Sequence, residues 1–209
     1  MSSPVYVESL VRTRIDVSEI RTEILRKSLH MLIAFVPLLA TIVGRGPSLA
    51  LLAAGILLYT NAEVMRHRGK TIPVITRITR AATRSAENPN GIILGPITLG
   101  LGAMASLLLY PETAAAVAVY ALAFGDGVSS LVGKALGRIR LPLLRGKSLE
   151  GSLACFVVVF GIAFRIIDSL FAAGLVALTA TVLEAVPLKD MDNILMPVGA
   201  GFVAGLFLV

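Results

Sequence analysis

Long apolar runs separated by short charged segments constrain this chain most. About seven such runs follow one another, each close to the roughly 20 residues with which an α-helix crosses a bilayer. They lie at roughly 29–44, 48–65, 91–110, 113–137, 151–167, 169–186 and 193–209. With 56% hydrophobic and 15% charged residues, the chain is excluded from the ordinary soluble class. We expect an all-α polytopic membrane protein with about seven transmembrane helices, forming a single domain over residues 1–209.

Two basic segments outside these runs predict amphipathic helices on the membrane surface. In residues 5–27, apolar side chains recur at roughly helical spacing with arginines between them, and residues 66–90 show a similar pattern. Basic amphipathic helices lie in the interface and bind anionic headgroups. Residues 1–28 are therefore expected as a cytoplasmic segment ahead of a bundle formed by residues 29–209. No cleavable signal peptide is expected, since the first apolar run follows this charged segment.

The distribution of charge predicts the orientation in the membrane. With seven spans, 17 of the 19 Lys and Arg residues fall on one side, and only Arg45 and Arg165 fall on the other. The positive-inside rule makes the basic side cytoplasmic, together with the N-terminus. Polar residues from several predicted helix ends gather on the same side, namely Glu23, His30, Asn61, Glu63, Asp126, Glu150, Glu184, Asp192 and Asn193. A site facing both the cytosol and the lipid would need this arrangement.

The segment 126–152 carries the strongest site signal. Asp126 follows a long apolar run, so we expect it near the end of a membrane helix, where an ionisable group is a functional-site hypothesis by default. On a helix, Asp126, Ser130, Gly133 and Gly137 share one face, which a bulky ligand could approach closely. The alternative is that the two glycines form a small-xxx-small helix contact.

A basic turn follows this face. Gly146-Lys147-Ser148 offers backbone N–H groups and an ammonium just before the next apolar helix, and Lys134 lies upstream. Such a turn can bind phosphate. It is not a Walker A loop, whose spacing is absent here. The alternative is that these cations only mark the cytoplasmic side.

The pattern Asp-x6-Gly-x3-Gly, followed by Lys-Ser-x-Glu-Gly-Ser, resembles the CTP-dependent lipid kinases. These include dolichol kinase, phytol and farnesol kinases and the CTP-dependent diacylglycerol kinase. The resemblance implies nucleotide contacts by Asp126, Gly133, Gly137, Lys147, Ser148, Glu150, Gly151 and Ser152. Ser129 stands where the family usually has Ala. Glu23, Lys27 and His30 match a Glu-x-x-Arg-Lys-x-x-His element of the family, and Asp192-Asn193 resembles its C-terminal element.

Phosphoryl transfer to an alcohol needs neutralisation of the triphosphate charge and an in-line hydroxyl. We expect CTP as donor and Mg²⁺ held by Asp126, Glu150 and Asp192, because Mg²⁺ prefers carboxylate and phosphate oxygens. The catalytic candidates are Asp126, Lys147, Glu150, His30 and Asp192, with either a carboxylate or His30 as general base. Ser130, Gly133, Lys134, Gly137, Ser148, Gly151, Ser152 and Asn193 are expected to bind the nucleotide. Glu23, Lys27, Asn61, Glu63 and Glu184 are expected to shape the substrate site.

The sequence leaves the alcohol open: polyprenol, dolichol, phytol and diacylglycerol all remain. A phosphatidate cytidylyltransferase is a second candidate, although the His and Asp-Arg of that family's C-terminal element are absent. A small transporter is a third, but its polar groups would lie at the midplane and no inverted repeat is visible. A structural lipid-binding protein is the fourth. Cys155, the only cysteine, lies in an apolar run and is expected to pack there.

Overall fold

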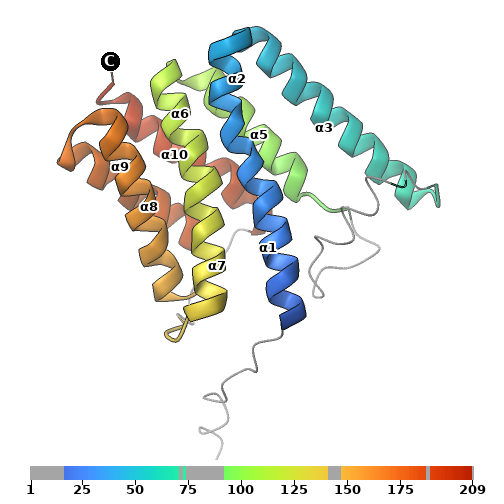
Figure 1. Ribbon diagram of the computed structural model, residues 1–209. Helices are drawn as coiled ribbons and strands as arrows, with labels where there is room; N and C mark the ends of the chain where they lie inside the picture. The colour runs from blue at the N-terminus through green and yellow to red at the C-terminus, as the bar shows by residue number, and fades with distance from the viewer. Residues whose placement is uncertain (1–16, 71–72, 74–91, 141–146, 187–188, 209) are drawn as a thin grey trace, which may run out of the picture.

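The computed structural model describes residues 17–70, 73, 92–140, 147–186 and 189–208, and it is a bundle of helices (Figure 1). In chain order the helices are α1 (Val17–Met31), η2 (Leu32–Ala34), α2 (Phe35–Val43), α3 (Arg45–His67), α5 (Gly95–Leu109), α6 (Glu112–Tyr120), η3 (Ala121–Asp126), α7 (Gly127–Leu136), α8 (Leu149–Ile167), α9 (Leu170–Ala185), η5 (Lys189–Met191) and α10 (Asp192–Gly205). Strands are absent from these residues, apart from one isolated bridge between Arg140 and Ser148. The predicted all-α class is confirmed.

Four helical runs in the described part of the chain are long and apolar enough to cross a membrane. They are Ile20–Val43, Arg45–His67, Glu112–Leu136 and Leu149–Ile167, while Gly95–Leu109 and Leu170–Ala185 are shorter apolar helices. These runs agree with the predicted polytopic membrane protein. The count of seven spans stays a prediction.

The first run begins earlier than the sequence suggested. Residues 17–27 are helical, as expected of the N-terminal amphipathic segment, but they continue through η2 and α2 without a break. Pro37 does not interrupt this run, because it occupies the first turn of α2, where a missing N–H costs no hydrogen bond. Glu23, Lys27 and His30 therefore belong to a helix of membrane length. The rest of that segment, and residues 71–72 and 74–90 of the second predicted surface helix, lie outside the described residues.

The core surrounds the continuous rod α6–η3–α7. Figure 1 shows this rod between α1 and α8. Its buried alanines and valines pack against Cys155 and Val159 of α8, Val176 of α9 and Met196 of α10. Small residues let these helices approach closely, as is typical of membrane bundles. Cys155 is buried there, as predicted.

The middle of this rod departs from regular α-helix. Residues Ala121–Asp126 form the π-helical segment η3, and Asp126 is its last residue. π-helical turns inside α-helices often occur at functional sites. In contrast to the central rod, α3 leans away from the rest of the bundle, so other helices do not enclose most of its length (Figure 1).

Candidate functional site

A buried polar cluster joins α1 to the central rod. We call Lys27, His30 and Asp126 the central cluster. Lys27 Nζ donates a hydrogen bond to Asp126 Oδ2, and His30 Nε2 lies 3.3 Å from the same oxygen. The three side chains are only 3%, 9% and 7% exposed. Charge buried this deeply in an apolar bundle requires a partner, and each charged group here has one.

His30 and Ser130 complete the surroundings of the carboxylate. His30 Nε2 also lies 3.1 Å from the carbonyl oxygen of Leu122, and Ser130 Oγ donates to Asp126 Oδ1 at 3.5 Å. Positions 27 and 30 are one helical turn apart, so both side chains point from α1 towards η3. The structure therefore brings together four residues that were predicted from two distant segments.

Asp126 does not lie near a helix end, which corrects the expectation from the sequence. It lies inside the run Glu112–Leu136 and is 5% exposed. The helix continues through Gly127 and Gly133 and ends at Leu136, with Gly137 as its C-cap. A Cβ on Gly127 would lie 2.5 Å from Met31 Cε, so this glycine permits the close approach of α1.

Glu23 links α1 to the end of α7. Its side chain is 1% exposed, with Arg26 Nη2 2.5 Å from Oε1 and Lys134 Nζ 2.6 Å from Oε2. Arg26 was not singled out from the sequence, although it lies within the Glu-x-x-Arg-Lys element. Lys134, predicted to bind nucleotide, is thus paired with a buried carboxylate.

A second polar cluster lies where α8, α9 and α10 meet. We call Lys147, Glu184 and Asp192 the α9–α10 cluster. Lys147 Nζ lies 2.6 Å from Glu184 Oε1 and 3.8 Å from Asp192 Oδ2, and it also donates to the backbone oxygen of Glu184. Asp126 interacts electrostatically with Lys147 and Asp192. The two clusters are thus within electrostatic range of one another, and together they contain four of the five predicted catalytic residues.

Several buried polar atoms lack a hydrogen-bond partner among the described residues. Two of them are Ser152 Oγ and Glu184 Oε2, the latter on the carboxylate that faces Lys147, whereas the Thr181 hydroxyl lies beside the Cys155 thiol. A buried polar atom that has no hydrogen bond is costly, so such atoms often mark a ligand or ordered water. Thr181 was missed by the sequence analysis, because a lone threonine inside an apolar helix gives no signal.

Asn193 holds the start of α10 against α5. Its backbone N–H donates to Asp192 Oδ1 at 2.9 Å, and its Nδ2 donates to Thr98 Oγ1 at 3.0 Å. Asp192 is the first residue of α10, and its carboxylate accepts from the N–H of the residue that follows it. Thr98 was also missed, since nothing in its surroundings distinguishes it from a packing residue.

The glycines and serine of the nucleotide motif form a tight contact between α7 and α8. Ser148 is buried at the N-terminus of α8 and accepts a hydrogen bond from the N–H of Gly151 at 3.1 Å. A Cβ on Gly133 would lie 2.9 Å from Ser148 Oγ, and one on Gly137 would lie 2.8 Å from it. The small residues therefore let the two helices meet, in agreement with the close-packing interpretation.

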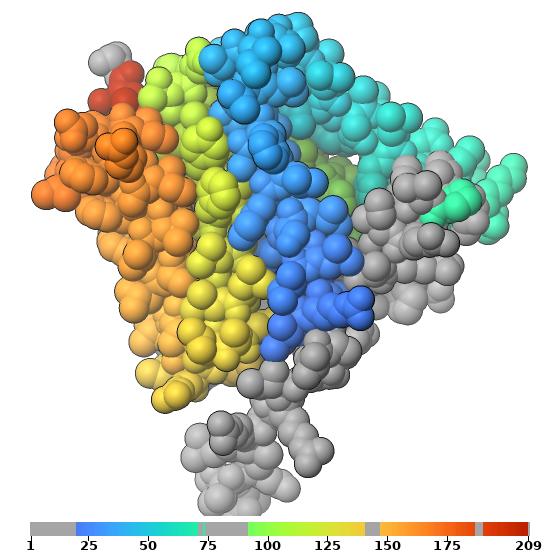
Figure 2. Space-filling model, in the orientation of Figure 1, coloured from blue at the N-terminus to red at the C-terminus, as the bar shows by residue number. Residues whose placement is uncertain are grey.

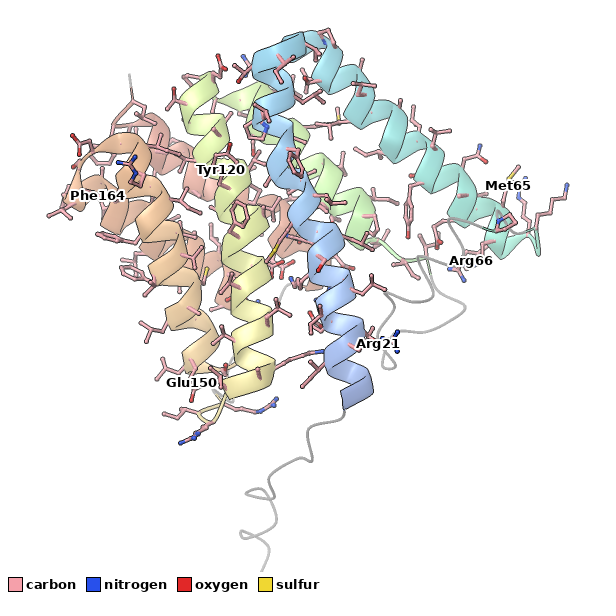
Figure 3. The ribbon with its side chains drawn as sticks, in the orientation of Figure 1. Arg21, Met65, Arg66, Tyr120, Glu150 and Phe164 are labelled. Atoms are coloured by element: carbon pink, nitrogen blue, oxygen red, sulfur yellow. The ribbon has the colours of Figure 1, made fainter. Side chains whose placement is uncertain are left out.

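Glu150 closes the turn that follows α7. Its Oε1 accepts hydrogen bonds from the backbone N–H groups of Arg138 and Ile139, at 2.9 and 3.2 Å. Figure 3 shows Glu150 at the end of the bundle that also carries Arg21. This carboxylate, predicted as a metal ligand, thus organises the loop.

Glu63 and Asn61 of α3 are not brought together. Glu63 is buried, lies 2.8 Å from Arg66 Nη2 and accepts from the N–H of Ile93 at 3.2 Å, whereas Asn61 is exposed. Residues two apart on a helix point in different directions. Glu63 therefore anchors the chain before α5, and Figure 3 shows its partner Arg66 at the outer end of α3.

The carboxylates offer Mg²⁺ a partial site. Within the described ranges, no three His, Cys, Asp or Glu side chains form a group that could hold a metal ion alone. Mg²⁺ with a nucleotide commonly uses only one or two protein carboxylates, while phosphate oxygens and water complete its shell. Asp126 and Asp192 are the carboxylates considered for this limited role.

Comparison with known proteins points to one group. A probable chloroplastic phytol kinase of Zea mays is 28% identical, with 76% of this chain and 54% of that protein aligned. Phytol kinase 1 of Arabidopsis thaliana is 23% identical (91% and 67%), and a phytol kinase of Synechocystis is 30% identical (43% and 42%). No family model matches the chain, and no solved structure matches it. The chain spans about half the length of the first of these relatives. It is similar to phytol kinases, which confirms the resemblance to the lipid kinase family that its motifs predicted.

Proposed function

We propose that this chain transfers the terminal phosphate of CTP to the hydroxyl of a membrane lipid alcohol, such as phytol or a polyprenol or dolichol. The observation that carries the proposal is the central cluster beside the α9–α10 cluster, inside a chain similar to phytol kinases. Lipid alcohols dissolve in the membrane, so a buried polar site on membrane helices suits them. The choice of CTP rests on the resemblance of the segment 126–152.

His30 is the proposed general base. Its Nε2 faces two acceptors, the Leu122 carbonyl and the Asp126 carboxylate, so Nε2 carries the hydrogen and Nδ1 carries the lone pair. The alcohol oxygen forms a bond to the terminal phosphorus, the bond from that phosphorus to CDP breaks, and the hydroxyl proton passes to Nδ1. Asp126 holds the ring and stabilises the imidazolium that forms.

Lys147 is the proposed phosphate ligand. Its side chain is 28% exposed, so incoming phosphate oxygens can reach it. Phosphate can replace one of the two carboxylates that Lys147 faces, and the pairing survives as a charge-assisted hydrogen bond. Lys134, 34% exposed and paired with Glu23, can act in the same way at the outer side.

Asp126 and Asp192 are the proposed holders of Mg²⁺, with Glu184 beside them. When bound, the ion neutralises charge on the transferring phosphoryl group. Glu150, also predicted in this role, lies at the α7–α8 turn, where its Oε1 accepts two backbone hydrogen bonds.

Purified protein in micelles tests the activity. CTP labelled at the terminal phosphate is offered with Mg²⁺ and phytol, dolichol, undecaprenol or diacylglycerol in turn. We expect label in the lipid with an alcohol of the isoprenoid class. A cytidylyltransferase would instead release the label as pyrophosphate and attach cytidine to the lipid. Equal transfer from ATP under matched Mg²⁺ would overturn the choice of CTP.

We also propose that the basic end of the bundle faces the cytoplasm. In a Cys155→Ala background, the variants Arg138→Cys and Gly46→Cys place single thiols at exposed positions of opposite helix ends. An impermeant thiol reagent should label the first only from the cytoplasmic side and the second only from the other side. Labelling of both from the same side would contradict the orientation.

A further inference from the structure

An apolar groove runs between α3 and the rest of the bundle. Its volume is about 300 Å³, with Leu51, Gly55 and Tyr59 of α3 on one wall and Ile33 on the other. Leu99 and Gly100 of α5 form its floor. In Figure 2 the green surface of α5 is visible between the blue and cyan helices. From Leu51 to Tyr59 the α3 wall extends about 12 Å.

Two glycines explain why this groove stays open. No atom lies within 4 Å of the place where a Cβ on Gly55 would stand, so the middle of the α3 wall is free space. A Cβ on Gly100 would lie 2.8 Å from Ile56 Cγ1, so this glycine allows α3 to contact α5 at the floor. The groove is thus built with a closed floor and an open side.

The groove and the central cluster share one helical run. Ile33 follows His30 by three positions, so the lining of the groove begins about one helical turn along this run from His30. The Tyr59 hydroxyl, the polar atom of the α3 wall, donates to the backbone oxygen of Ile93 at 3.4 Å. The lining therefore presents hydrocarbon to an occupant whose polar end would reach the site.

A second apolar groove does not share a helical run with His30. It lies between the central rod and α8, is lined by Tyr120, Phe124, Gly161 and Arg165, and includes no residue of α1. Phe124 precedes Asp126 by two positions and so faces another direction. Size does not favour the first groove, because the second is larger, at about 530 Å³.

We propose that the groove between α3 and α5 holds the hydrocarbon tail of the lipid alcohol, with its hydroxyl at His30 and Asp126. The proposal rests on the function proposed above and adds the residues that select the tail. The tail leaves lipid rather than water, so the groove gains little from hydrophobic transfer. Its contribution is to position the hydroxyl and to discriminate between tails by length and branching.

Gly55→Phe fills the groove and tests this role. We expect kcat/KM for phytol to fall roughly tenfold or more, while that for a short isoprenoid alcohol such as geraniol changes less than about threefold. The KM for CTP should stay unchanged. Gly161→Phe is the matched control, since Gly161 is an exposed mid-helix glycine with open space in the second groove. Equal effects of the two variants on phytol, or none from Gly55→Phe, would overturn the proposal.

Photo-crosslinking gives a readout that needs no turnover. A phytol analogue carrying a diazirine at the far end of its tail is irradiated with wild-type protein, and the labelled peptides are mapped. We expect labelling of α3 and α5 that excess phytol suppresses. Labelling on α8, or labelling that phytol does not suppress, would refute the binding of the tail in this groove, even if the enzyme phosphorylates phytol. Suppressible labelling of α3 without phosphorylation of any alcohol would keep the groove and refute the kinase.

Discussion

Two helical runs of membrane length have opposite surroundings in this protein. In the most apolar 18-residue stretch of Glu112–Leu136, 61% of the residues are buried. In the corresponding stretch of Arg45–His67 the share is 17%. The first run has helices on several sides, while the second exposes leucines such as Leu57 and Leu58 to lipid. The two runs have similar apolar sequences. Only the enclosed run carries a charge in its middle, since only there can α1 supply partners for it.

The difference separates two tasks within one bundle. The enclosed run holds Asp126, whose charge is stable because Lys27 and His30 are fixed beside it. Along its middle the open run α3 offers mainly hydrocarbon, and its buried Glu63 lies near its end, beside Arg66. The buried charged residues thus lie in the centre of the bundle, and the apolar residues that face lipid lie at its periphery.

The largest effect is expected from Asp126→Asn. The substitution leaves Lys27 buried without its carboxylate, which should cost about 3–5 kcal/mol of stability. Turnover should fall by roughly two to three orders of magnitude. The double variant Lys27→Met/Asp126→Asn should recover most of the stability and none of the activity. Melting temperature and lipid phosphorylation are measured on the same preparation.

The matched change in the open run is Glu63→Gln. It should destabilise less than Asp126→Asn, because Arg66 lies near a helix end where water can replace its partner. A stable Asp126→Asn protein with near-native activity would remove this residue from the mechanism. It would also remove the distinction between the two runs.

A smaller effect is expected from Lys147→Ala. The KM for CTP should rise roughly tenfold, because a phosphate ligand acts in the ground state as well as in the transition state. Arg138→Ala is the control, because Arg138 is an exposed cation after α7 and its backbone N–H can still donate to Glu150 in the variant. The KM for CTP is measured for both variants. Equal increases would mean that CTP binding depends only on the total positive charge at the basic end of the bundle.

The smallest effect compares two glycines. A Cβ on Gly125 would lie 2.7 Å from both Met196 Cε and Val159 Cγ2, so Gly125→Ala should cost about 1–3 kcal/mol through overpacking. Gly55→Ala meets open space and should stabilise by up to about 1 kcal/mol through helix propensity. Thermal unfolding in one detergent measures both. If Gly55→Ala destabilised as much as Gly125→Ala, α3 would be packed as tightly as the central rod.

The sequence predicted the fold class, because apolar runs of bilayer length leave the backbone few alternatives to helix. It also singled out Glu23, Lys27 and His30 through their match to the family element, and it singled out Asp126. Their meeting was not predictable, because periodicity defines which residues share a face and says nothing about which helix that face contacts. Gly127 leaves room for the Met31 side chain at that contact, and a glycine among many gives little warning of it.

The two acidic predictions Glu150 and Glu184 show the same limit. Both lie at helix ends in the sequence, and the motif favoured Glu150 as the metal ligand. In the structure Glu150 accepts backbone hydrogen bonds from the turn, while Glu184 faces Lys147 with one oxygen unpartnered among the described residues. Loop conformation made this distinction, and loop conformation is the part of a fold that residue patterns specify least.

The π-helical turn of η3 determines the direction in which the side chains after it point from the helix that carries the site. Such a turn accommodates one residue more than an α-helical turn, so everything from Asp126 onward is rotated by about 100° relative to a regular continuation of α6. If the same residues formed a regular α-helix, the carboxylate would turn away from α1 with its chemistry intact. Deleting one residue of the π-helical turn would instead convert it to α-helix and leave the carboxylate pointing towards α1. The direction of the central charge therefore depends on the helix type of this segment, so its local conformation constrains the protein as much as its composition does.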